Sequence, residues 1–314
     1  MLTGLSLSTV ALLLVAGVVL DLLLGETRRW HPLVGFGNLA NFIERRLNRG
    51  NLRLPRGGLA WALAVLPLTA LFVLLTDGAG LWLHAVLLYL CIGLRSLHDH
   101  TIPIYEALRS GDLAQARALT ARIVSRDTAN ASESDLAKAS AESLLENGND
   151  AVFGTLFWFI LLGGPGAVLF RLANTLDAMW GYRSTRFNLF GRPAARIDDV
   201  MNYVPARLTA LSYVLLAGAG RARAWHCWRT QAPAWSSPNA GPVMASGAGA
   251  LGVSLGGAAV YDGEVEQRPP LGAGPAACAG DIQRAWQLVL RTTLLWLGVV
   301  CLLAVLTMIG APHA

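Results

Sequence analysis

Long uncharged stretches constrain the fold of this chain more than any other feature. Residues 1–20 carry no charged side chain, and the apolar run continues to Leu24. Residues 58–76 and 292–310 are also uncharged, and as helices they are long enough to cross a bilayer core of about 30 Å. Residues 5–24 lack the basic start and small-residue cleavage site of a signal peptide, so a retained transmembrane helix is expected. The chain is therefore expected to lie in a lipid bilayer.

The charged residues limit which chemistry is available. Only 14% of residues are charged, against about 25% in soluble domains, and the net charge of +5 comes from arginine, since Lys138 is the only lysine. No Gly-Lys-Ser/Thr tripeptide exists, which excludes a Walker A loop, so arginines, backbone amides or a metal must hold any phosphate. The four cysteines show no CxxC spacing, which argues against disulfides and zinc. No nucleic-acid partner is expected.

The positions of the arginines predict the topology. Residues 25–57 and 182–207 are rich in arginine and are expected in the cytoplasm. Residues 81–94 are predicted to be a further membrane span. Residues 208–220 are too few to cross upright, so an interfacial, a re-entrant and a tilted segment all remain open.

Residues 151–170 are apolar but are interrupted by Gly163-Gly164-Pro165-Gly166. Each half is too short to cross the bilayer, so a re-entrant helical hairpin is predicted. The sequence thus predicts an all-α integral membrane protein with about four full transmembrane helices, this hairpin and long cytoplasmic loops. All of it is expected to form one membrane-embedded domain, residues 1–314.

Two segments are candidates for a functional site. Residues 228–263 contain prolines, an Asn-Ala-Gly turn and a string of glycines, and they are predicted to be a loop that presents backbone amides to a substrate. The second candidate is acidic. Glu142, Glu146 and Asp150 share one helix face at i, i+4 and i+8.

The predicted hairpin extends this acidic face. A turn near Gly164-Pro165 would bring Val152 level with Asp177 and Thr155 level with Asn174, and so would gather Asp150, Asn174 and Asp177. Carboxylates at the edge of an apolar hairpin need partners. Two interpretations remain open: a Mg²⁺–phosphate site, or ion pairs with nearby arginines, which are Arg171, Arg183 and Arg186.

Six motifs in order resemble the CobD/CbiB family of cobalamin biosynthesis across essentially the whole chain. They are DLLLGETRRWHPLVGFGNLANFIE at 21–44, SRDT at 125–128, ENGNDAVFGTLFW at 146–158, RLANTLDAMWGYR at 171–183, RIDDVMNYVPARLTAL at 196–211 and WRTQAPAWSSPNAGPVMA at 228–245. Two departures from the family pattern are Thr27 and Thr155, where relatives often carry proline. Neither departure removes a candidate catalytic group.

This resemblance implies an ATP-dependent acid–amine ligase, adenosylcobinamide-phosphate synthase. Such an enzyme joins (R)-1-amino-2-propanol phosphate, or aminopropanol, to the f carboxylate of adenosylcobyric acid, with the carboxylate activated as an acyl phosphate. ATP and Mg²⁺ are the implied cofactors, and the corrinoid and the amine are the implied partners. The implied location is the bacterial cytoplasmic membrane, multi-pass, with the active site facing the cytoplasm. A homo-oligomer is left open.

Site residues follow from the motifs and from the chemistry of each side chain. The expected catalytic residues are Glu146, Asp150, Asp177 and His31, of which Glu146, Asp150 and Asp177 are also the expected metal ligands. The expected substrate and phosphate ligands are Arg126, Asp127, Asn174, Arg183, Arg229, Ser237, Asn239 and Gly241. Trp228 and Trp235 would either face the corrin or anchor the chain at the membrane interface.

Two other functions compete with the ligase. One is a non-enzymatic membrane sensor, because the family also resembles AmpE-type inner-membrane proteins. The other is a small-molecule transporter, which the broken helix suggests. Both leave the SRDT and Ser-Pro-Asn-Ala-Gly-Pro segments unexplained.

Overall fold

The computed structural model describes residues 4–27, 31–182 and 184–310. It divides into two compact units, each built from separate stretches of chain. The first unit comprises Met1–Gly93, Asp150–Asn202 and Leu297–Ala314. The second comprises Leu94–Asn149 and Tyr203–Trp296.

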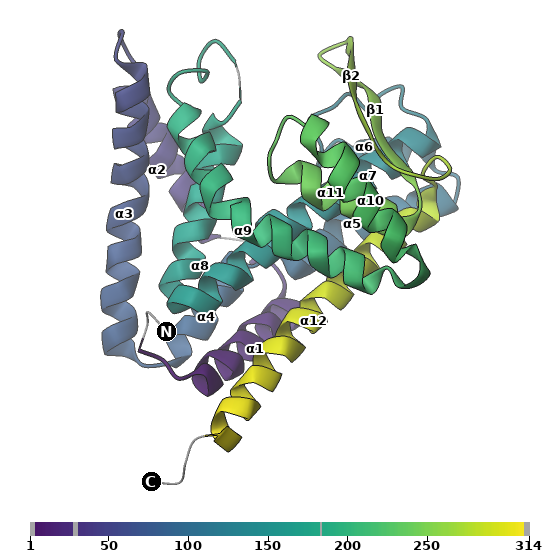
Figure 1. Cartoon of the computed structure of the whole chain (residues 1–314). Helices are drawn as coiled ribbons and strands as arrows, with labels where there is room; N and C mark the ends of the chain where they lie inside the picture. Colours follow the sequence, from purple (N-terminus) through teal and green to yellow (C-terminus); the bar gives the residue numbers. More distant parts are fainter. Residues whose placement is uncertain (1–3, 28–30, 183, 311–314) are drawn as a thin grey trace. The chain divides into compact units, whose positions relative to one another are not determined.

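The first unit is helical (Figure 1). Its elements are α1 (Leu7–Leu24), α2 (Pro32–Leu47), α3 (Arg53–Ala79), α4 (Trp82–Cys91), most of a π-helix (Gly148–Phe153), α8 (Gly154–Trp180), the start of α9 (Arg192–Leu216) and the end of α12 (Ala279–Gly310). Helix α8 is central, because α1, α2, α3 and α4 all pack against it.

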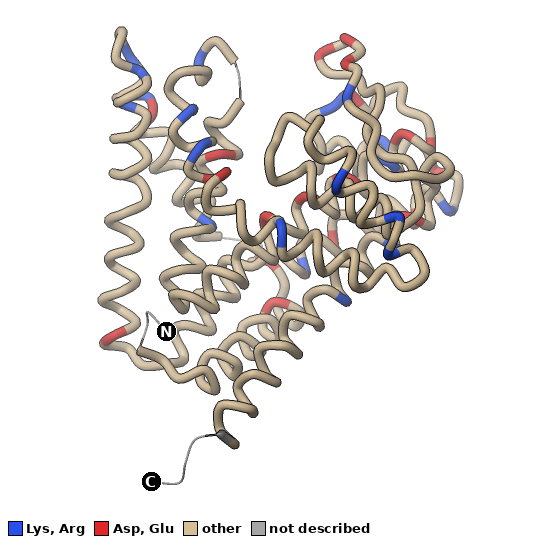
Figure 2. The backbone as a smooth tube through the Cα atoms, viewed as in Figure 1, with Lys and Arg blue, Asp and Glu red and all other residues tan. Residues whose placement is uncertain are grey.

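Four described helices are long and apolar enough to cross a membrane: Leu7–Leu24, Arg53–Ala79, Glu133–Trp180 and Ala279–Ile309. Helix α3 exposes large apolar side chains such as Leu66 and Leu74 and carries no charge between Arg56 and Asp77 (Figure 2). An exposed apolar surface of this size is typical of a helix in contact with lipid and not with water. The chain is therefore a multi-pass membrane protein, as the sequence predicted.

The identity of the spans differs in one place from the expectation. The predicted span at residues 81–94 is helix α4, which has 10 residues and is too short to cross. Residues 208–220 form mainly the end of α9, which is not among the apolar helices long enough to span. The fourth candidate is instead the helical run Glu133–Trp180, which includes the π-helix and α8 and is interrupted at Gly163.

The predicted helical hairpin is present within α8. Gly163 has φ 66° and ψ −157°, which interrupts the helix. A Cβ atom at Gly166 would collide with the carbonyl oxygen of Trp158, and one at Gly154 would collide with the ring of Phe170. Such contacts between residues 8 and 16 positions apart require the two halves to run antiparallel. The chain turns at Gly163, slightly before the predicted turn, so the register that pairs Val152 with Asp177 is wrong.

The second unit contains helices and one β-hairpin, which an all-α fold did not anticipate (Figure 1). Its main elements are α5 (Leu94–Arg109), α6 (Leu113–Thr120), α7 (Glu133–Asn147), the end of α9, α10 (Arg221–Gln231), α11 (Ala240–Leu251), β1 (Ser254–Tyr261), β2 (Glu264–Gly272) and the start of α12. Strands β1 and β2 are antiparallel and pair Tyr261 with Glu264. Asp262 and Gly263 both have positive φ, as a two-residue hairpin turn requires.

The glycine string of residues 228–263 is therefore not an open loop. Its residues form the end of α10, helix α11 and strand β1, and α11 is buried almost throughout. A Cβ atom at Gly247 would lie 2.7 Å from the Leu145 side chain on α7, and one at Gly249 would lie 2.7 Å from Cα of Ala224 on α10. The glycines thus allow α11 to approach both neighbouring helices closely. Gly247 and Gly249 therefore serve helix packing, and presentation of backbone amides to a substrate by this segment stays a prediction.

Replacing Gly166 by alanine should destabilise the first unit by about 1–3 kcal/mol, because the methyl group overpacks the helical hairpin. The melting temperature of detergent-purified protein measures the effect. Gly58→Ala is the matched control, since a Cβ atom at Gly58 in α3 meets nothing within 4 Å. Equal melting temperatures for the two variants would contradict the antiparallel arrangement.

Candidate functional site

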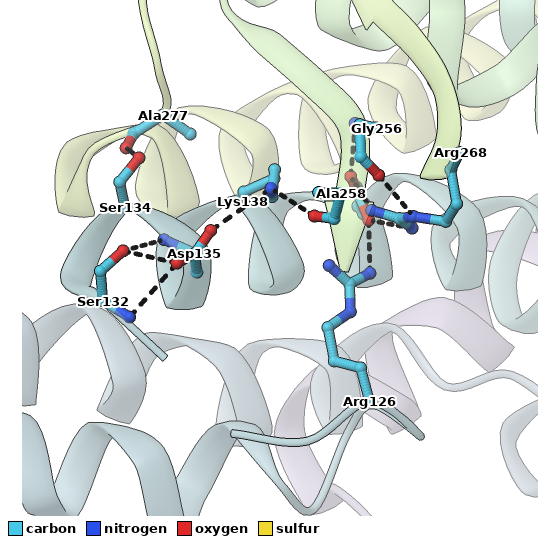
Figure 3. Close-up of polar contacts among 11 residues, drawn as sticks. Arg126, Ser132, Ser134, Asp135, Lys138, Gly256, Ala258, Arg268 and Ala277 are labelled. Atoms are coloured by element: carbon cyan, nitrogen blue, oxygen red, sulfur yellow. Dashed lines mark hydrogen bonds and ion pairs between the residues drawn. The ribbon is translucent and has the colours of Figure 1, made fainter. Parts of the chain in front are cut away.

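A buried carboxylate, Glu142, organises the candidate site in the second unit. Helix α7 starts at a capping box between Ser132 and Asp135, and Glu142 lies in its buried middle. Its side chain is 3% exposed and forms ion pairs with Arg126 and with Arg268, whose Nη1 lies 3.0 Å away. The backbone N–H of Gly256 donates a further hydrogen bond of 2.7 Å. Figure 3 shows Arg126, Arg268 and Gly256 converging from three separate segments.

Asp127, which follows Arg126 in the SRDT segment, connects this segment to the β-hairpin. The backbone N–H of Asp127 donates to the carbonyl oxygen of Val260 at 2.8 Å. The carboxylate of Asp127 accepts a hydrogen bond of 2.8 Å from the backbone N–H of Gly263 in the hairpin turn. Arg126 and Asp127, predicted as phosphate ligands, therefore hold β1 and β2 against α7. Only the donors of Arg126 that are not bound to Glu142 are left to contact a phosphate.

Arg268 connects Glu142 to an aromatic wall. Its guanidinium also donates to the carbonyl oxygen of Gly257 and stacks over Trp235 at 5.6 Å from the ring centroid. Trp235 lines a cavity of about 590 Å³. The residues around this tryptophan cavity are Tyr203, Arg207, Trp228, Arg229, Ala232, Pro233, Trp235, Ser236, Pro238 and Pro242. It combines aromatic surface with two arginines.

The two arginines of the tryptophan cavity differ in their partners. Arg207 donates to Oδ1 of Asn239 at 2.6 Å and lies 3.6 Å from the centroid of Tyr203. Arg229 is exposed at the end of α10 and stacks loosely on Trp225. No hydrogen bond or ion pair occupies Arg229 within the described part of the chain. Its donors are therefore available to an anionic ligand.

The predicted amide cradle at residues 237–241 is already used internally. Oγ of Ser237 accepts from the backbone N–H groups of Asn239 and Ala240 at 3.3 and 3.2 Å. The carbonyl oxygen of Ser237 accepts from Gly241. A Cβ atom at Gly241 would lie 2.7 Å from the carbonyl oxygen of Ala232, so this glycine permits close packing. These groups begin helix α11 and position Asn239 against Arg207.

A second cavity of about 460 Å³ lies between α7, the SRDT segment and the β-hairpin. It includes the only lysine of the chain and is called the lysine cavity below. Its lining residues are Arg126, Asp127, Thr128, Ala129, Asn130, Ala131, Asp135, Leu136, Lys138, Ala139, Ala258, Ala259, Val260, Gly263 and Val265.

The predicted catalytic acids belong to different units. Glu146 is in the second unit, one turn after Glu142, and no described residue donates a hydrogen bond to its carboxylate. Asp150 and Asp177 are in the first unit, in the π-helix and near the end of α8. The charge of Asp150 acts on Arg171, and the choice between an ion pair and a metal–phosphate site stays open.

Metal binding by these acids stays a prediction. Among the described residues, no three His, Cys, Asp or Glu side chains are grouped to hold a metal ion. Mg²⁺ that is bound together with phosphates needs only one or two carboxylate ligands from the protein. Either Asp150 or Asp177 by itself would meet that requirement. The carboxylate of Asp177 lies against Gly181, where a Cβ atom would collide with it.

Three further predicted residues are His31, Arg183 and Arg186. His31 caps α2, with Nδ1 accepting from the backbone N–H of Leu33 at 3.2 Å, and burial lowers the pKa of its imidazole. In the neutral ring Nδ1 carries the only lone pair, which the backbone N–H of Leu33 already uses, so the role of His31 as a base stays a prediction. Arg183 lies outside the described residues. Arg186 pairs with Glu44 in α2, and not with the acids of the hairpin.

Asn174 is bound to a carboxylate that is not one of the predicted site residues. Its side-chain amide donates to Asp198 at 3.2 Å, and Asn202 donates to the other oxygen of Asp198 at 3.1 Å. Burial raises the pKa of Asp198 to about 6, although both amides and the charge of Asp199 also act on it. This cluster ties α8 to α9.

Sequence reasoning missed two arginines of the site. Arg268 lies in a segment rich in glycine and proline, which gave no sign that it would form a strand facing α7. Arg207 lies in the RIDDVMNYVPARLTAL motif, four residues after Tyr203. This spacing puts both side chains on one helix face, and it was the sequence signal that could have pointed to Arg207. Glu142 was part of the predicted acidic face, but its two arginine partners come from distant segments.

Comparison with known proteins agrees with the motifs. A family model described as CobD/Cbib protein matches residues 14–289. The chain is 56% identical over 294 residues to a cobalamin biosynthesis protein CobD of Stutzerimonas stutzeri, covering 92% of this chain and 96% of that one. It is 52% identical over 323 residues to a protein of the same name from Chromobacterium violaceum, covering 97% and 99%. No solved structure matches the chain.

Glu142→Gln should destabilise the second unit by about 3–5 kcal/mol, because it leaves Arg126 and Arg268 buried without a compensating charge. Thermal unfolding in detergent measures this. The control is Glu133→Gln in the exposed first turn of α7, where loss of a charge costs below about 1 kcal/mol. A Glu142→Gln protein as stable as the control would show that the ion pairs contribute little.

Stability should depend on pH through Asp198. Since its folded-state pKa of about 6 exceeds the value near 4 of an unfolded chain, the folded state binds the proton more tightly. This stabilisation is complete below pH ~4 and is lost as pH rises through about 6. The melting temperature should therefore fall between pH 5 and 7 by more in the wild type than in Asp198→Asn. Identical pH profiles would contradict the assignment.

Proposed function

The chain belongs to the CobD/Cbib family, and from this premise we propose that it is the amide-forming ligase of cobalamin biosynthesis. Its substrates would be adenosylcobyric acid and aminopropanol or its phosphate, with the site facing the cytoplasm from the bacterial inner membrane. Relatives named cobalamin biosynthesis protein CobD align with this chain over almost their whole length, which supports the assignment.

The observation that carries the proposal is the tryptophan cavity. A corrinoid has a broad apolar ring with polar side chains, and Trp228 and Trp235 supply aromatic surface beside the available donors of Arg229. Arginine binds a carboxylate with two parallel hydrogen bonds. The cavity therefore fits a large ligand that presents an acid group. Its 590 Å³ accommodates part of a corrinoid rather than all of it.

The two implied cofactors fit the chain to different degrees. Arg229 is exposed and keeps available donors, so an arginine for a triphosphate exists without a lysine loop. ATP would supply the energy that a carboxyl group needs before an amine can displace its oxygen. Asp150 and Asp177 remain the carboxylates proposed for Mg²⁺. No step is assigned to the metal, because the described residues contain no formed metal site.

The chain's own groups have three roles under this proposal. Arg229 orients the acid of the corrinoid. Trp235, held by Arg268, supports the apolar face of the corrinoid. Glu146, which accepts no hydrogen bond from a described residue, is proposed to take a proton from the attacking ammonium group.

The test is amide formation by detergent-purified protein supplied with adenosylcobyric acid, aminopropanol phosphate, ATP and Mg²⁺. Mass spectrometry should detect the adenosylcobinamide phosphate product. A folded protein that forms no amide from intact substrates would reject the ligase and would favour the sensor or the transporter.

Arg229→Ala should lower kcat/KM for the corrinoid about 10- to 100-fold, mainly through KM, because it removes charge-assisted hydrogen bonds to the acid. Steady-state kinetics with the corrinoid as the varied substrate measures the change. Arg221→Ala is the control, since Arg221 begins the same helix and does not line the tryptophan cavity. Equal losses in both variants would remove Arg229 from the proposed site.

A further inference from the structure

The lysine cavity is a second, partly open cavity that the proposed roles do not use. Its floor is α7, and its walls are the SRDT segment and the β-hairpin. It shares no lining residue with the tryptophan cavity. Arg126 belongs to its lining and is held by Glu142, so this cavity and the tryptophan cavity are both supported by the same buried carboxylate.

The walls of the lysine cavity are fixed by hydrogen bonds. Asp127 holds Val260 and Gly263 through its backbone N–H and its carboxylate. Lys138 reaches from α7 to the carbonyl oxygen of Ala258 at 3.1 Å. The cavity is thus formed without a ligand, and a ligand would not have to order its walls.

Two cationic groups of the lysine cavity keep unused donors. Lys138 is 17% exposed and uses two of its three N–H donors, on Ala258 and on Asp135 at 3.4 Å. Nη1 of Arg126 is buried and has no hydrogen-bond partner among the described residues. Figure 3 places the terminal nitrogen of Arg126 that carries no dashed line on the side of Ala258 and Lys138. A buried donor without a partner is costly, and an anion would satisfy it.

We propose that the lysine cavity binds a small phosphorylated molecule, with its phosphate between Lys138 and Nη1 of Arg126. The other walls are small and apolar and include Ala129, Ala139 and Val265, which suits a short carbon skeleton. Asp127 and Asp135 complete the lining, so a ligand that also carries an ammonium group matches it. The identification of the natural ligand as a phosphorylated amine rests on the proposed function. The binding of phosphate in this cavity does not depend on it.

Isothermal titration of the full-length protein in detergent, at fixed ionic strength, tests the inference. Inorganic phosphate and 1-amino-2-propanol phosphate are the probes, and acetate is the carboxylate comparison. Both phosphates should bind saturably to the wild type, and acetate should not. Lys138→Gln should weaken phosphate binding about tenfold or more, whereas Lys138→Arg should retain most of it.

The matched control is Arg122→Gln, which removes one positive charge from the same unit without touching the lysine cavity. It should bind phosphate as the wild type does. Absence of saturable phosphate binding, equal binding of acetate, or equal effects of Lys138→Gln and Arg122→Gln would each overturn the inference. Arg229→Ala separates the two proposals, because it should impair amide formation and leave intact the phosphate binding that Lys138→Gln weakens. Phosphate binding in a protein that forms no amide would reject only the ligase.

Discussion

The second unit depends on the burial of one carboxylate among cations. Glu142 joins α7 to the SRDT segment and to both strands of the β-hairpin, where its partners Gly256 and Arg268 are 114 and 126 residues away in the sequence. A charge placed this deep is costly alone, and with two guanidinium groups and a backbone N–H it is compensated. Replacing any member leaves the others without a partner. The local architecture therefore tolerates little variation at Glu142, Arg126 and Arg268.

This network also explains why the candidate ligand sites lie where they do. Arg268 reaches Trp235 on one side, and Arg126 reaches the lysine cavity on the other. Glu142 fixes the positions of both arginines, so the guanidinium atoms that it does not bind face a ligand in either cavity with little freedom to move. Preorganised donors of this kind bind without paying for side-chain ordering.

The sequence predicted the membrane class and the helical hairpin, because apolar runs and glycine–proline interruptions are local signals. It did not predict the β-hairpin, because residues 254–272 contain Gly-Gly and Pro-Pro pairs that look like linker. For the same reason Arg268 was not considered. The glycines of α11 were misinterpreted because a glycine needed for close helix packing and one needed in a loop are identical in a single sequence. The metal, ATP and substrate assignments remain predictions.

The chain order of the second unit has a consequence for biosynthesis. Glu142 and Arg268 are 126 residues apart, and the first unit's stretch Asp150–Asn202 is made between them. At about 5–20 residues per second, translation takes roughly 6–25 s to cover that interval. During this time Glu142 has only Arg126 as a cationic partner, and the helical hairpin is synthesised before the second unit can close. A nascent chain arrested ahead of Arg268 would therefore contain three of the four described long apolar helices, without α12, and an unfinished polar core.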